Sequence, residues 1–99
     1  MSKYARRVDQ NHNPILAAYE KLGVAVVDLS KMAQFEPGLP DLLCSLHGLT
    51  WFSETKTEAG KLNAAQIHFA KLWKGRIEVV RTVDDVFEVV KSVKRNALA

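Results

Sequence analysis

The first part of the chain alternates short apolar stretches with polar breaks, a pattern that predicts a helix followed by a strand. Asn13 and Pro14 form a helix-start signal, since Asn caps free backbone amides and Pro fits the first helical position. Apolar residues then recur at helical spacing over residues 15–22 until Gly23 stops the helix. The β-branched run over residues 24–29 predicts a central strand buried on both faces.

The middle of the chain predicts a loop and then a β-hairpin. Residues 30–40 contain two prolines and a glycine, which argues against regular structure over this segment. Strand-favouring residues then extend over 41–46 and 50–57, on either side of a turn at His47 and Gly48. We therefore expect two paired strands over these ranges.

The last part of the chain predicts a helix, a strand and a final helix. Asn63 and Gln66 have the spacing of a capping box, and Gly75 is the expected stop of the helix that they begin. Residues 76–80 read as a strand, and Thr82 caps the last helix. The apolar faces of the two helices carry Phe69, Ala70 and Trp73, and Val83, Val86, Phe87 and Val90. The order of elements favours an α/β fold with a mixed sheet flanked by helices.

Length and composition limit the chain to one domain. A chain of 99 residues can build a single core, and we divide it into a basic arm (1–12), a core (13–93) and a tail (94–99). Fourteen Lys and Arg residues against eleven Asp and Glu give a net charge of +3 and a pI of about 9.2. This mild excess suits a polyanionic partner but does not identify one.

The cysteine and histidine residues, together with the lack of long apolar segments, narrow the expected cellular location and the kinds of metal site. Cys44 is the single cysteine, so it cannot form an internal disulfide, and we expect it to pack in a strand. The sequence has neither an apolar segment near its start nor a long apolar run, so we expect a soluble cytoplasmic protein. His47 and His68 have no zinc-ligand spacing with Cys44, and we expect both to be surface residues.

Two acidic residues and a lysine have a spacing that could form a metal site. Side chains two apart in a strand point the same way, so Glu54 and Lys56 share a face while Thr55 faces the other side. If Asp41 opens the neighbouring strand, its carboxylate lies across from Glu54. Two carboxylates and the carbonyl of Thr55 are hard oxygen ligands of the kind Mg²⁺ prefers, and Lys56 can orient a water or hold a phosphate.

A simpler interpretation is that Glu54 and Lys56 are solvated and that Asp41 is a turn residue, because Glu-x-Lys is a common triplet. Three features favour the metal site. Phe52 shares the face of Glu54, Asp41 follows a Gly-x-Pro loop, and Gln66 extends from the apolar stripe of the next helix. Burying a charged cluster against a packed helix costs folding free energy. Such a cluster therefore favours a functional role.

Taken together, these segments resemble the PD-(D/E)xK nuclease superfamily, and more narrowly the stand-alone, phage-type form of the virus-type replication-repair nuclease (VRR-NUC) domain. The similarity lies in GLPDLL at residues 38–43, FSETK at 52–56 and KLNAAQ at 61–66, and it extends over about residues 9–93. The resemblance implies an α-β-β-β-α-β core with a mixed central sheet, to which this chain adds a C-terminal helix.

The resemblance also implies roles for individual residues. Asp41 and Glu54 would bind the metal, and Thr55 would add its backbone carbonyl. Lys56 would be the catalytic lysine, and Gln66 would support the catalytic group. The implied cofactor is Mg²⁺, with Mn²⁺ able to substitute.

The first helix departs from the pattern of the family. Such families often carry a glutamate there that helps to hold the metal, but residues 11–15 contain no acid. His12 can fill this role through a water. Glu20 is a second candidate for metal or water support, although it is explained as well by a solvent-facing position beside Lys21.

Function is expected to follow from this site. No helix has the Asn, Gln and Arg spacing of a groove reader, so shape and backbone charge remain for recognition. VRR-NUC domains resemble Holliday-junction resolvases in architecture, and two-fold junctions suit a homodimer. We therefore expect a metal-dependent, structure-selective DNA endonuclease of repair or recombination, specifically a junction resolvase of phage, prophage or bacterial origin.

The sequence is also compatible with other functions, and several basic residues are candidates for contacts with DNA. The alternatives are a flap or DNA-end-processing nuclease, a DNA-binding protein on a decayed nuclease fold, and a small subunit that acts only with a partner. The candidate phosphate contacts are Arg6, Arg7, Lys61 and Arg81.

Overall fold

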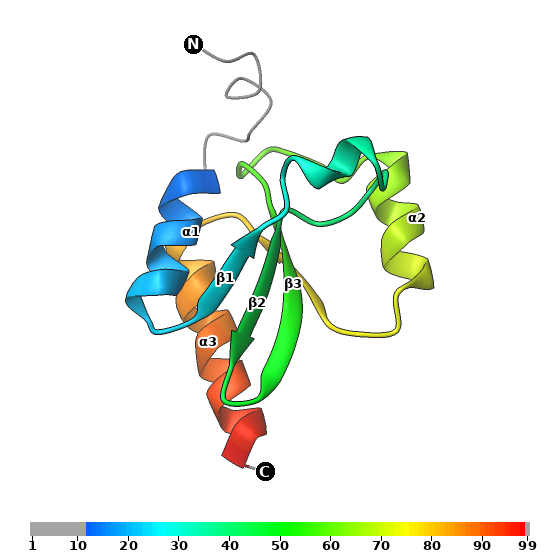
Figure 1. The fold of residues 1–99 in the computed structure, drawn as a ribbon. Helices are drawn as coiled ribbons and strands as arrows, with labels where there is room; N and C mark the ends of the chain where they lie inside the picture. The colour runs from blue at the N-terminus through cyan, green and yellow to red at the C-terminus, as the bar shows by residue number, and fades with distance from the viewer. Residues whose placement is uncertain (1–11, 99) are drawn as a thin grey trace.

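The computed structural model describes residues 12–98, which form one four-stranded mixed sheet and three α-helices (Figure 1). The elements in chain order are α1 (His12–Lys21), β1 (Ala25–Asp28), the short 3₁₀ helix η2 (Met32–Gln34), β2 (Leu42–Leu46), β3 (Leu49–Thr55), α2 (Ala64–Leu72), β4 (Ile77–Val80) and α3 (Val83–Leu98). This order confirms the predicted α/β fold with a mixed sheet and a C-terminal helix. No helix within this part of the chain is both long and apolar enough to cross a membrane.

The strands lie in the order β1-β2-β3-β4, with the first three antiparallel and β4 parallel to β3. The parallel pair requires a crossover, and α2 provides it. The tight turn between β2 and β3 is formed by His47 and Gly48, which both have positive φ angles of 52° and 80°. Such angles at both central residues match the twist of a two-residue hairpin, so the predicted hairpin is confirmed.

The prediction that residues 24–29 form a central strand is wrong, because β1 is an edge strand. Its alternate residues have different surroundings: Val26 packs against the core, whereas Val27 is 54% exposed on the opposite face. A β-branched run indicates a strand but does not fix its place in the sheet. The central strands are β2 and β3.

One face of the sheet is covered by α1 and α3, and the main core lies between them and the strands. The last helix buries Val86, Val89, Val90 and Val93. The predicted apolar face of this helix is therefore only half right, because Val83 and Phe87 are exposed. The helix also continues to Leu98, so the predicted tail at 94–99 is helical through its described residues.

The other face of the sheet is contacted by α2 through aromatic rings. The ring of Phe52 lies 5.9 Å from that of Phe69 and 4.9 Å from that of Trp73, measured between centroids. The predicted stripe of α2 is confirmed for these two residues, whereas Ala70 is exposed. Because α2 is short and ends at Leu72, before Gly75, side chains such as Val27 and Val79 on this face remain exposed.

Candidate functional site

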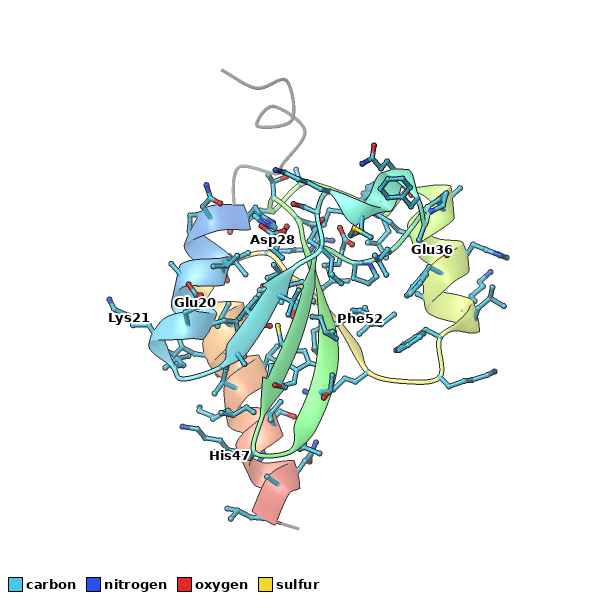
Figure 2. All side chains as sticks on the ribbon, in the orientation of Figure 1. Glu20, Lys21, Asp28, Glu36, His47 and Phe52 are labelled. Atoms are coloured by element: carbon cyan, nitrogen blue, oxygen red, sulfur yellow. The ribbon has the colours of Figure 1, made fainter. Side chains whose placement is uncertain are left out.

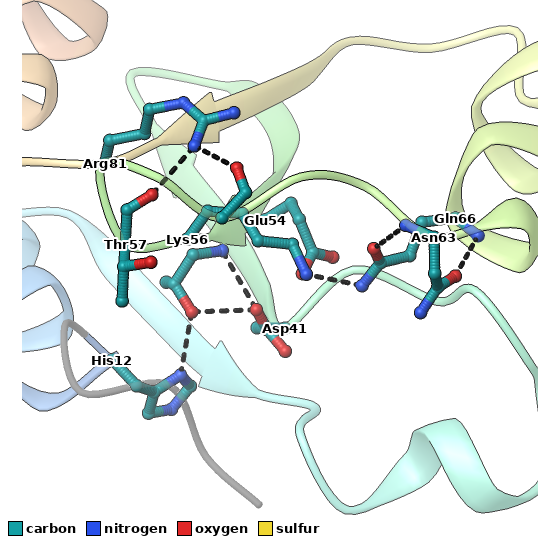
Figure 3. Close-up of polar contacts among 10 residues, drawn as sticks. His12, Asp41, Glu54, Lys56, Thr57, Asn63, Gln66 and Arg81 are labelled. Atoms are coloured by element: carbon teal, nitrogen blue, oxygen red, sulfur yellow. Dashed lines mark hydrogen bonds and ion pairs between the residues drawn. The ribbon is translucent and has the colours of Figure 1, made fainter.

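The predicted acidic pair lies where β2 begins and β3 ends. Leu42 pairs with Ser53 across these antiparallel strands, so Asp41, the residue before β2, lies beside Glu54. Asp41 Oδ2 accepts hydrogen bonds from the backbone N–H and the hydroxyl of Thr55, at 2.9 and 2.8 Å (Figure 3). These two bonds fix the orientation of the Asp41 carboxylate at the edge of the sheet.

Glu54 is almost fully buried, with 3% of its surface exposed. Its Oε2 accepts a hydrogen bond from Gln66 Nε2 at 3.0 Å and lies 3.8 Å from the ammonium of Lys56. Burial of a carboxylate is costly unless hydrogen bonds and an opposite charge compensate it, and here both are present. The structure thus brings Glu54, Lys56 and Gln66 together.

Gln66 is held in place by the start of α2. Its backbone N–H donates to Asn63 Oδ1 and its Oε1 accepts from the Asn63 backbone N–H, both at 2.9 Å, so the predicted capping box is confirmed. The remaining amide donor, Nε2, points to Glu54. The cap of the helix therefore sets the orientation of the side chain that supports the buried carboxylate.

Gly38 brings the loop of residues 30–40 against the same helix. Its φ angle is 86°, and a Cβ at this position would clash with the backbone carbonyl of Ala65. Only glycine accepts both constraints without strain. The loop that leads to Asp41 is therefore packed directly beside the start of α2.

His12 lies next to the acidic pair and is 2% exposed. Its Nε2 lies 3.0 Å from Asp28 Oδ2, and its Nδ1 lies 3.4 Å from Thr55 Oγ1. Burial opposes ionisation of Asp28, but the hydrogen bonds from His12 and Ser30 hold the pKa of this carboxyl below its usual value. Asp28 therefore faces His12 as a carboxylate at neutral pH.

Asp28 was not among the predicted site residues. In the sequence, Asp28 is an acid at the end of a β-branched strand. This position points to the site only once β1 is known to pair with β2. Glu20, by contrast, is exposed two helical turns beyond His12, on the outer side of α1 with Lys21 (Figure 2). The structure does not bring Glu20 to the acidic pair.

The residues predicted to contact DNA lie in separate segments of the chain. Lys61 is exposed in the loop before α2. The guanidinium of Arg81 donates to the backbone carbonyls of Thr57 and Glu58, at 2.8 and 3.5 Å, and to that of Gly60. Arg81 therefore holds the loop between β3 and α2. The basic arm with Arg6 and Arg7 lies outside the described residues.

A second cluster of buried polar side chains lies between α1 and the sheet. The hydroxyls of Tyr19 and Ser53 are 2.7 Å apart, Trp51 Nε1 donates to Tyr19 at 3.4 Å, and Cys44 donates to Ser53 at 3.8 Å. Burial raises the pKa of Tyr19 to about 12 and that of Cys44 to about 11, so both stay neutral at physiological pH. This cluster joins α1 to the sheet, and Cys44 packs in a strand as predicted.

His47 and His68 are exposed, also as predicted.

The donor set of the acidic pair fits a magnesium ion. Within residues 12–98, no three His, Cys, Asp or Glu side chains form a metal-binding group. A metal at this position would be held by the carboxylates of Asp41 and Glu54 and the backbone carbonyl of Thr55. These are hard oxygen donors, and Mg²⁺ is commonly held by one or two protein carboxylates together with waters and substrate phosphate.

No family model, curated protein or solved structure matches the chain.

Proposed function

We propose that this chain is a metal-dependent, structure-selective DNA endonuclease that cleaves Holliday junctions. The observation that carries the proposal is the position of Asp41 beside Glu54 at one end of β2 and β3, with the Lys56 ammonium 3.8 Å from the Glu54 carboxylate. Two carboxylates and an ammonium at one point are the groups that metal-assisted phosphodiester hydrolysis requires. The three antiparallel strands followed by α2 and a parallel β4 also fit a PD-(D/E)xK core.

A purely structural ion pair explains this arrangement less well. Glu54 shares its face of the sheet with Phe52, and its parallel neighbour is Val79, so apolar side chains lie beside its polar partners Gln66 and Lys56. Buried ion pairs commonly contribute no more stability than well-packed apolar residues of similar size. A pair of charges on such a face therefore favours a chemical role.

Each residue has a distinct part in the proposed reaction. Asp41 and Glu54 would hold a Mg²⁺ ion, for which Mn²⁺ could substitute. Such an ion would supply Lewis-acid activation of the scissile phosphate and of a water. Lys56 would orient the attacking water or stabilise the charge that develops on the phosphate, and Gln66 would keep the Glu54 carboxylate in place through its hydrogen bond.

The choice of DNA structure can be tested with a panel of labelled four-way junctions, flaps and linear duplexes in Mg²⁺ buffer. We expect paired, symmetric cuts in the junction and slow cleavage of the duplex. Preferred cleavage of the flap would instead identify a flap or end-processing nuclease. Binding of all three DNAs without any cleavage would identify a DNA-binding protein on a decayed nuclease fold.

Binding of DNA is expected to depend steeply on salt and little on sequence. The chain carries a net charge of +3, and contacts to phosphates release counterions, so affinity falls as salt rises. Fluorescence anisotropy with junctions of identical shape and unrelated sequences should give similar dissociation constants at each salt concentration. A marked preference for one duplex sequence would contradict recognition by shape and charge.

The active form is expected to be a homodimer. The loop before β2 exposes apolar side chains, with Met32 46% and Phe35 72% exposed, and such surface is available for contact with a second copy. A two-fold pair would present two copies of Asp41 and Glu54 to the two symmetric phosphates of a junction. Light scattering should report twice the chain mass of 11.1 kDa. A strict monomer that cuts both strands of a junction would rule out the dimer.

A further inference from the structure

A continuous line of hydrogen bonds joins three separate elements to the Asp41 carboxylate. It runs from Asp28 at the end of β1, through His12 in the first turn of α1, to Thr55 at the end of β3 and on to Asp41. Figure 3 shows the part of this line from His12 to Asp41. We propose that Asp28, His12 and the Thr55 hydroxyl, here called the brace, are positioning residues that hold the Asp41 carboxylate for metal binding. This inference rests on the proposed nuclease function.

The direction of the bond between Thr55 and Asp41 follows from the carboxylate, whose oxygen accepts. Thr55 has one hydroxyl hydrogen, and it is donated to Asp41 Oδ2 at 2.8 Å. His12 Nδ1 lies 3.4 Å from the same hydroxyl oxygen. At the other end of the brace, His12 Nε2 lies 3.0 Å from Asp28 Oδ2. The contacts of His12 therefore link Asp28 to the hydroxyl that donates to Asp41.

Burial makes the brace hard to replace by water. His12 is 2% exposed and Thr55 is fully buried. Within the described residues, no buried side-chain nitrogen or oxygen lacks a hydrogen-bond partner. Loss of the Thr55 hydroxyl would leave the buried Nδ1 of His12 without its hydrogen-bond partner and would remove one of the two bonds that orient Asp41.

The brace is expected to act on metal affinity. Ligating carboxylates and imidazoles are oriented by the hydrogen bonds behind them, and loss of such partners typically lowers metal affinity or activity by about 10- to 100-fold. Asp41 receives both of its hydrogen bonds on Oδ2, from the backbone and hydroxyl of Thr55. Without the hydroxyl, the carboxylate keeps the single backbone bond and can rotate about it.

Four variants separate positioning from folding. Thr55→Val removes the hydroxyl while keeping the backbone carbonyl and a similar shape, and Thr55→Ser keeps the hydroxyl. Asp28→Ala breaks the far end of the brace at a side chain that is 45% exposed, so little of the core is disturbed. Glu20→Gln is the matched control, because it alters an exposed acid on the helix that carries His12.

The measurement is Mn²⁺ binding without DNA by isothermal titration calorimetry, with a thermal melt of each variant. We expect the dissociation constant for Mn²⁺ to rise about 10- to 100-fold in Thr55→Val and to rise less in Asp28→Ala. Glu20→Gln should bind as the parent protein does, and Thr55→Ser should restore the affinity that Thr55→Val loses. The Mn²⁺ concentration that gives half-maximal junction cleavage should rise in the same order.

The possible outcomes distinguish this inference from the proposed function. Unchanged Mn²⁺ affinity in Asp28→Ala and in a folded Thr55→Val would overturn the brace while leaving the nuclease proposal intact. Failure of Thr55→Ser to restore affinity would likewise overturn it, since the hydroxyl would then not be the active group. If the parent protein neither binds Mn²⁺ nor cleaves DNA, the proposed function fails and the brace fails with it.

Discussion

Asp41→Asn and Glu54→Gln are each expected to abolish junction cleavage while leaving the fold and DNA binding largely unchanged. Each change removes one negative ligand charge at constant shape, so the metal loses affinity whereas the packing is retained. An amide at either position keeps an oxygen that can accept the existing bonds from Thr55 or Gln66. Initial rates on a labelled junction, measured beside the melting temperature and the dissociation constant for DNA, provide the check.

The matched control for these two changes is Glu58→Gln. Glu58 is an exposed acid that follows β3 by three residues, so its neutralisation changes net charge equally without touching the acidic pair. We expect this variant to cleave at the parent rate. Full activity in either Asp41→Asn or Glu54→Gln would contradict the nuclease proposal.

Lys56→Ala is expected to lower the cleavage rate by about a hundredfold or more, which is the usual loss when one stabiliser of transition-state charge is removed. The side chain is 14% exposed and lies 3.8 Å from Glu54, so it can reach a phosphate held at the same metal. The loss should appear in kcat more than in KM. Single-turnover rates at saturating enzyme and Mg²⁺ measure this directly.

Lys21→Ala provides the control for loss of a positive charge, because Lys21 lies exposed at the far end of α1. Its cleavage rate should equal that of the parent protein. If Lys56→Ala also retains the parent rate, Lys56 serves only as a partner for the buried Glu54 carboxylate and has no part in the reaction.

The order of elements was predictable because its signals are local. The Asn63 and Gln66 capping box, the His47-Gly48 turn and the helical spacing of apolar residues each depend on a few neighbouring positions. The place of β1 at the edge of the sheet was not predictable in this way. It depends on which strands pair across the fold, and a β-branched run is compatible with an edge or a centre.

The acidic pair was predictable for a similar reason. A two-residue hairpin fixes the register of β2 and β3, so Asp41 had to lie near Glu54 once the turn was located. The contacts of His12 with Asp28 and Thr55 join residues 16 and 43 positions apart on different elements. No local pattern encodes such contacts, and the sequence suggests His12 only as a replacement for the missing first-helix acid.

Cleavage of a labelled four-way junction in Mg²⁺ and in Ca²⁺ tests the central claim most directly. Ca²⁺ offers the same charge and binds oxygen ligands, but its looser geometry makes it a non-supporting ion for this chemistry. We expect paired strand cuts by the purified protein in Mg²⁺, and none in Ca²⁺ or with Glu54→Gln in either ion. Junctions that remain uncut in Mg²⁺ and Mn²⁺, by a protein that is folded and binds them, would contradict it.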